Sequence, residues 1–104
     1  MTDPMSRRDQ VVAAIRQLVE TGLTSGSSGN VSVRADGGML ISPTGLAPAA
    51  LAPSDVVAMA LDGEVAGNQL RPSSEWRIHA DIYRAKPEVN AVVHCHSPYA
   101  TILA

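Results

Sequence analysis

Apolar side chains first recur at helical spacing between residues 7 and 21, with polar residues between them. The apolar positions are Val11, Val12, Ile15, Leu18 and Val19. Ser6 can cap the start of such a helix, Asp9 lies where a capping box places an acid, and Gly22 can end it. The pattern predicts an amphipathic helix over residues 7–21.

Short alternating or apolar runs follow, and they predict strands. Residues 31–34 and 39–42 read as two strands joined by Ala35-Asp36-Gly37-Gly38, because Asp-Gly and Gly-Gly supply the positive φ angles of a tight hairpin. Pro43-Thr44-Gly45 has turn chemistry and ends the second strand. Three further segments come next: one helical turn within 47–54, a strand at 55–60 and a turn at 61–64.

The last third of the chain predicts a second helix and one more strand. Ser73-Ser74-Glu75 opens a helix over about residues 74–85, with a serine at the cap, and Pro87 helps to end it. Residues 89–96 have a nearly continuous apolar centre, which is typical of a buried strand. The order of elements suggests helices packed on a largely antiparallel sheet. Ser97-Pro98 then reads as the opening of another helix, which predicts that the chain is a truncated product.

Composition narrows the class of protein. With 104 residues, 45% of them apolar and 17% charged, the chain suits one small globular domain. A net charge of −2 does not favour nucleic acid as a partner. The single Cys95 cannot form an internal disulfide, which fits a cytoplasmic location. No apolar run is long enough for a membrane span, so we expect no membrane partner.

His94 and His96 are the strongest candidates for chemistry. Residues i and i+2 of a strand point to the same face, about 6.5–7 Å apart, so two imidazoles can converge on one metal ion. Cys95 points to the other face and is not counted as a ligand. Two separately hydrogen-bonded histidines at a strand end are the alternative, and His-x-His by itself is a weak motif.

Anion-binding chemistry is the second candidate. Glu75 lies at a helix N-terminus, which can hold it ionised or bind a substrate phosphate beside it, although a plain N-cap is the more common role. His79 lies four residues further on and is interpreted as structural, paired with Glu75 or a neighbour. A neutral anion nest could also form from backbone and side-chain donors. Its candidate residues are Asn30, Thr44, Gly45, Ser73 and Ser74.

Four motifs in this order resemble the class II aldolase/adducin family, and within it the L-fuculose-phosphate aldolases. They are Gly26-Ser27-Ser28-Gly29-Asn30-Val31-Ser32-Val33-Arg34, Met39-Leu40-Ile41-Ser42-Pro43-Thr44-Gly45, Pro72-Ser73-Ser74-Glu75-Trp76-Arg77-Ile78-His79 and Ala91-Val92-Val93-His94-Cys95-His96-Ser97. The similarity runs over nearly the whole chain from about residue 10. Residues 1–104 are therefore interpreted as the N-terminal portion of one class II aldolase/adducin domain.

The resemblance implies a three-layer α/β/α sandwich around a mainly antiparallel sheet, usually assembled as a homotetramer. It implies that His94 and His96 bind one Zn²⁺ per subunit, and that Glu75 is the catalytic acid/base and can also touch the metal. It assigns phosphate binding to the five residues of the anion nest. The reaction would be cleavage of a ketose 1-phosphate, such as L-fuculose 1-phosphate, to dihydroxyacetone phosphate and an aldehyde.

Two points keep alternatives open. The third zinc histidine of the family lies beyond Ala104, which predicts that the 104-residue chain is inactive alone. Relatives in the family are pentulose-phosphate 4-epimerases, sugar-phosphate dehydratases or decarboxylases, and Glu75 favours the aldolase because the epimerases carry Asp there. A non-catalytic scaffold, as in adducin, is a further alternative, although it has no need of His94, His96 and Glu75 together.

Overall fold

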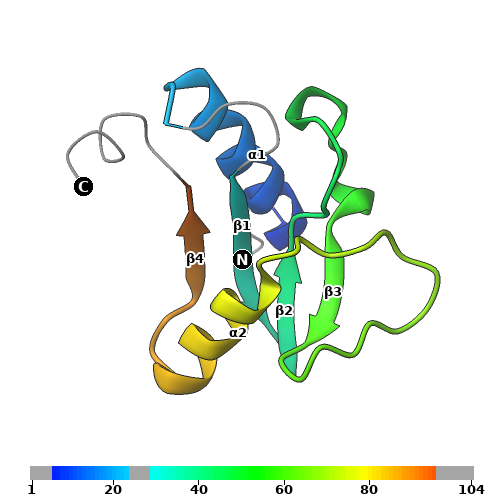
Figure 1. The fold of residues 1–104 in the computed structure, drawn as a ribbon, viewed down its shortest axis with the longest axis vertical. Coiled ribbons are helices and arrows are strands. Elements are labelled where there is room, and N and C mark those ends of the chain that lie inside the picture. Colours follow the sequence, from blue (N-terminus) through cyan, green and yellow to red (C-terminus); the bar gives the residue numbers. More distant parts are fainter. Residues whose placement is uncertain (1–5, 24–28, 96–104) are drawn as a thin grey trace.

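The computed structural model describes residues 6–23 and 29–95, which form a sheet with one helix on each face (Figure 1). The described elements, in chain order, are α1 (Arg7–Glu20), β1 (Asn30–Ala35), β2 (Gly38–Ile41), the 3₁₀ turns η1 (Pro48–Ala50) and η2 (Pro53–Asp55), β3 (Val57–Ala60), α2 (Trp76–Ala85) and β4 (Ala91–His94). The strand order is β3-β2-β1-β4, and each of the three pairs is antiparallel. This confirms the predicted α/β/α sandwich with a mainly antiparallel sheet.

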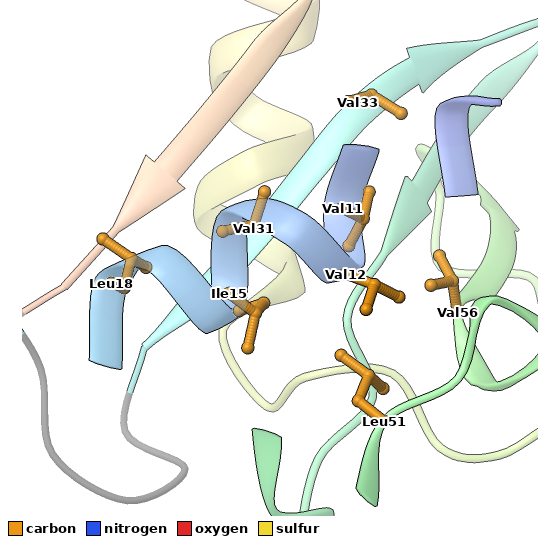
Figure 2. Packing of buried hydrophobic residues seen from close by; sticks show 8 residues of the cluster. All are labelled: Val11, Val12, Ile15, Leu18, Val31, Val33, Leu51 and Val56. Atoms are coloured by element: carbon orange, nitrogen blue, oxygen red, sulfur yellow. The ribbon is translucent and has the colours of Figure 1, made fainter. Parts of the chain in front are cut away.

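Helix α1 forms where the apolar spacing predicts it. The Asp9 N–H donates to the Ser6 hydroxyl at 3.1 Å, and Gly22 follows the helix with φ of 74°. The apolar stripe of α1 packs on one face of β1 and on the 3₁₀ region (Figure 2). The buried cluster is Val11, Val12, Ile15, Leu18, Val31, Val33, Leu51 and Val56. Burial of this stripe removes apolar surface from water, and it holds that side of α1 on the sheet.

Helix α2 covers the opposite face of the sheet (Figure 1). Its buried residues join the side chains of β2, β3 and β4 that point away from α1. This second cluster contains Met39, Ile41, Val57, Met59, Ala80, Tyr83 and Val92. Two clusters on two faces give the three layers. In the part of the chain that the structure describes, no helix is long and apolar enough to cross a membrane.

The β1–β2 hairpin has the predicted turn. Ala35 pairs with Gly38, which leaves Asp36 and Gly37 as a two-residue connection, and Gly37 has φ of 72°. Gly38 has a separate reason to be glycine, because a Cβ there would lie 2.1 Å from the Met59 backbone oxygen on β3. The strands are one or two residues displaced from the predicted bounds, and β3 begins at Val57 because Asp55 belongs to η2.

Two predictions about the last third of the chain were wrong. Helix α2 begins at Trp76, with Glu75 rather than a serine at its N-cap. The cause is a tertiary contact: Pro72 bridges Pro43, and the Ser73 N–H donates to the Ser42 oxygen at 2.9 Å. Ser74 and Glu75 then form a turn, and the helix begins after it. Strand β4 is half covered rather than buried, with Val93 54% exposed, because within the described residues only β1 flanks it. The predicted helix opening at Ser97 lies outside the described residues.

Candidate active site

Three segments that are distant in sequence meet at one end of the sheet. Asn30 is the first residue of β1 and pairs directly with His94, the last residue of β4. Glu75 is the N-cap residue of α2, the helix that covers the face of the sheet opposite α1. Asn30, Glu75 and His94 are therefore neighbours in space, as the resemblance implied for residues of one site. His96 lies outside the described residues, and the structure says nothing of its place.

The Glu75 carboxylate is held between two partners. Its Oε1 accepts from the Asn30 amide nitrogen at 2.9 Å, and its Oε2 lies 3.0 Å from Nδ1 of His94. The side chains of Glu75 and His94 are about a third and a quarter exposed, so both reach solvent from a partly enclosed position. A carboxylate fixed at both oxygens, yet open to water on one side, is placed to exchange a proton with a bound molecule.

Behind Asn30, a row of buried polar groups leads into the layer between β1 and α2. Asn30 Oδ1 bonds to Nε2 of His79, and Nδ1 of His79 lies 2.6 Å from the Ser32 hydroxyl. The Ser32 hydroxyl also lies 2.7 Å from the Tyr83 hydroxyl. Asn30, Ser32 and His79 are each at most 3% exposed. Every polar atom of this row has a partner, as burial of polar groups requires.

Burial also sets the protonation of the two titratable groups in this row. The pKa of His79 is lowered from 6.5 to about 4, mainly by burial and in part by the nearby His94, while Glu75 opposes the shift. His79 is therefore neutral at neutral pH. Burial raises the pKa of Tyr83, against opposing interactions with Ser32, Arg34 and the Val92 backbone. The tyrosine therefore keeps its hydroxyl hydrogen.

The loops expected to bind phosphate lie side by side. The Thr44 N–H donates to the Arg71 oxygen at 3.0 Å, which joins the loop after β2 to the segment before α2. Ser73 is 7% exposed, and its hydroxyl accepts from the Glu75 N–H at 3.2 Å. Thr44, Gly45 and Ser74 are exposed beside it. Gly45 has φ of 75°, a conformation that favours glycine.

The donors present fit two positions of a zinc site. Zinc bonds of ~2.0–2.2 Å in a tetrahedron place two ligand atoms about 3.3 Å apart. The 3.0 Å between His94 Nδ1 and Glu75 Oε2 is close to that separation, and imidazole and carboxylate are both zinc ligands. Among residues 6–23 and 29–95, no group of three or more His, Cys, Asp or Glu side chains could hold a metal ion. The further ligands would have to come from other residues, of which His96 is the one predicted.

The sequence did not reveal two members of the buried row, Ser32 and Tyr83. For His79 it predicted only a partner in Glu75 or a neighbour. His79 contacts Asn30 and Ser32 rather than Glu75. A signal was available, because Asn30 and Ser32 lie two apart on one strand and His79 and Tyr83 four apart on one helix. Two polar pairs at matching periods can face each other across two layers. Nothing in the sequence showed that these particular layers would meet.

Comparison with known proteins assigns this chain to one family. Residues 9–104 match the model of the class II aldolase and adducin N-terminal domain. The chain therefore belongs to the class II aldolase/adducin family.

Individual relatives show which members of the family this chain is similar to. The chain is 48% identical over 97 residues to a 5-methylthioribulose-1-phosphate/5-deoxyribulose-1-phosphate aldolase of Rhodospirillum rubrum, covering 93% of this chain and 43% of the relative. It is 40% identical over 95 residues to an L-fuculose phosphate aldolase of Escherichia coli strain K12, covering 91% and 44%. A solved structure of an L-fuculose 1-phosphate aldolase matches with a TM-score of 0.87 and 34% identity, over 99% of this chain and 49% of that one. The chain thus spans less than half the length of these relatives.

Proposed function

We propose that a protein carrying this chain is a metal-dependent aldolase that cleaves a ketose 1-phosphate to dihydroxyacetone phosphate and an aldehyde. The observation that carries the proposal is the Glu75 carboxylate, which meets the Asn30 amide on one oxygen and the His94 ring on the other. An aldolase needs an acid/base group beside a metal ligand, and a scaffold does not. The family membership and the aldolase names of the relatives support this interpretation.

His94, His96 and Glu75 are the proposed ligands of one Zn²⁺. Bound there, zinc supplies Lewis-acid polarisation of a carbonyl oxygen. Glu75 moves the proton at the carbon where the carbon–carbon bond breaks, since its carboxylate is fixed in place and partly shielded from water. The 3.0 Å contact between His94 Nδ1 and Glu75 Oε2 places that carboxylate beside the proposed ligand.

The loops joined at Pro43 and Pro72 are the proposed seat for the substrate phosphate. Thr44, Gly45 and Ser74 are exposed there, beside the N-terminus of α2, whose helix dipole favours an anion. Ser73 and Asn30 border the same region. The Asn30 amide nitrogen carries two hydrogens, and its bond to Glu75 uses one of them. Anchoring the phosphate fixes the carbons to be separated against Glu75.

Two ketose 1-phosphates are candidate substrates, because the relatives are named for different sugars. Release of dihydroxyacetone phosphate from 5-deoxyribulose 1-phosphate and from L-fuculose 1-phosphate should be measured with the 104-residue chain and with a longer protein, in which this chain is extended to the length of its relatives. We expect cleavage by the longer protein. Failure of the longer protein to cleave any ketose 1-phosphate would contradict the proposal.

Glu75→Gln tests the acid/base role in the longer protein. The amide keeps the shape of the side chain but cannot exchange the proton, so we expect kcat to fall roughly 10²- to 10⁴-fold. Glu64→Gln is the matched control, because Glu64 is exposed in the turn after β3, and its activity should not change. Equal activity of the two variants would remove Glu75 from the reaction.

Metal binding has its own test. Zinc content of the longer protein should be measured with and without His94→Ala, and we expect the variant to lose most of its zinc. Unchanged zinc content would show that His94 is not a ligand. The homotetramer and the cytoplasmic location stay predictions, and sedimentation of the longer protein would test the first.

A further inference from the structure

The buried row behind the candidate active site has a fixed direction of hydrogen bonding. An ionised carboxylate only accepts, so the atom of Asn30 that faces Glu75 must be the amide nitrogen. Asn30 Oδ1 is thereby turned toward His79 and must receive a hydrogen from Nε2. A flipped amide would set its oxygen against the Glu75 carboxylate oxygen. It would also set its nitrogen, which carries hydrogens, against the Nε2–H of His79. The orientation of the amide and the hydrogen on Nε2 therefore depend on each other.

The second ring nitrogen of His79 extends the same argument. A neutral imidazole with its hydrogen on Nε2 has Nδ1 as an acceptor, so the Ser32 hydroxyl must donate to it. The Ser32 oxygen then accepts from the Tyr83 hydroxyl. All the donors point one way, from Tyr83 through Ser32, His79 and Asn30 to Glu75. Each group fixes the orientation of the next, and the row ends on the proposed acid/base.

We propose that His79 is a positioning residue whose Nε2–H holds the Asn30 amide so that its nitrogen faces the Glu75 carboxylate. Its effect on the reaction rests on the proposed function, but the orientation itself does not. The rival explanation is that His79 only fills the space between β1 and α2. That explanation predicts that the ring's volume matters and its hydrogen does not.

Two substitutions separate volume from hydrogen bonding. His79→Gln puts an amide nitrogen close to the place of Nε2 and keeps a donor toward Asn30. His79→Phe keeps an aromatic ring and removes the donor. Ile15→Ala, in the α1 cluster on the other face of the sheet, is the matched control because it loosens the core without touching the row.

The first readout is nuclear magnetic resonance of the ¹⁵N-labelled 104-residue chain. We expect the ring nitrogens of His79 to show the Nε2–H tautomer at neutral pH. We expect the two side-chain amide hydrogens of Asn30 to be slowly exchanging in the unsubstituted chain, in His79→Gln and in Ile15→Ala, and to exchange freely in His79→Phe. The Nδ1–H tautomer, or an unchanged Asn30 amide in folded His79→Phe, would overturn the proposal. If His79→Phe does not fold, two results still overturn the proposal. They are the Nδ1–H tautomer of His79 in the unsubstituted chain and a freely exchanging Asn30 amide in His79→Gln.

The second readout is the longer protein's cleavage of a ketose 1-phosphate. We expect kcat to fall roughly 10- to 100-fold in His79→Phe, as for other groups that orient an active-site side chain, and to recover in part in His79→Gln. Ile15→Ala should keep kcat while losing stability. Equal kcat losses in His79→Phe and Ile15→Ala would support the space-filling explanation instead. If the unsubstituted protein cleaves no ketose 1-phosphate, the proposed function fails, and the Asn30 and His79 signals still decide the positioning role.

Discussion

The two faces of β1 show two different ways of using one strand. Val31 and Val33 point toward α1 and are buried in an all-apolar cluster (Figure 2). Asn30 and Ser32 point toward α2 and are just as buried, but each is held by directed hydrogen bonds. Apolar contacts have no direction, whereas each hydrogen bond of the row fixes a donor and an acceptor. The α1 face therefore stabilises the sheet, and the α2 face orients groups at the candidate active site.

The comparison predicts large, pH-independent losses on the apolar face. Ile15→Ala should lower the free energy of unfolding by about 2–5 kcal/mol, because a buried branched side chain leaves a cavity that its neighbours fill only in part. Urea unfolding of the 104-residue chain at pH 5 and pH 8 would measure it. The loss should be the same at both pH values. A loss that appears at one pH only would break the distinction between the faces.

The polar face should instead respond to pH. The pKa of His79 is lowered in the folded chain from 6.5 to about 4, so the unfolded chain binds more protons between these values. Stability then rises with pH through this window: the contribution is fully present above about pH 6.5 and is lost as the pH falls toward 4. The full change should be on the order of 3 kcal/mol. Unfolding of His79→Gln over the same pH range is the control, and it should lack this component.

A smaller effect is expected at the far end of the row. Tyr83→Phe removes the hydroxyl that bonds to Ser32 but keeps the ring in the second cluster, so we expect a loss of about 1 kcal/mol. The bond from Ser32 to His79 should survive. Unfolding measurements would give the loss, and the tautomer of His79 should stay as it is. A switch of the His79 tautomer in Tyr83→Phe would show that the Tyr83 hydroxyl, and not Ser32 alone, fixes the direction of the hydrogen bonds.

The smallest effect should come from a site outside both faces. Ser6→Ala removes the hydroxyl that accepts from the Asp9 N–H at the start of α1, and the cap is exposed. We expect a loss of roughly 0.5–1 kcal/mol. Ser6→Asp is the matched variant, because a carboxylate accepts the same bond and should retain most of the stability. Equal losses in the two variants would show that the cap contributes little to α1.

Much of the fold could be predicted from local pattern. The spacing from Val11 to Val19 gave α1, and Asp36-Gly37 gave the hairpin with its positive φ at the second residue. These features depend on neighbours in sequence, where periodicity and turn chemistry apply. The start of α2 could not be predicted this way, because the contacts of Pro72 and Ser73 with the loop after β2 leave Ser74 and Glu75 in a turn ahead of the helix.

The candidate site, too, could be predicted only in part. Asn30, Glu75 and His94 were proposed as site residues on the strength of ordered motifs, and they do meet in space. The prediction that Thr44, Gly45 and Ser74 bind phosphate, and that His96 binds zinc, stays a prediction. Ser32 and Tyr83 went unnoticed because their spacing from Asn30 and His79 places each pair on one face of its own element but does not show that the two faces meet.

By itself, the sequence determined the helices, the hairpin, the family and the residue types that can bind a metal ion or a phosphate, because periodicity, turn chemistry and ordered motifs are written along the chain. Only the tertiary structure decided that α2 lies on the face of β1 that carries Asn30 and Ser32. That packing buried His79 between them, and burial in turn required a partner for each ring nitrogen. The direction of the row, and its end at Glu75, follow from groups that are about 50 residues apart in the chain and within hydrogen-bonding distance in the fold.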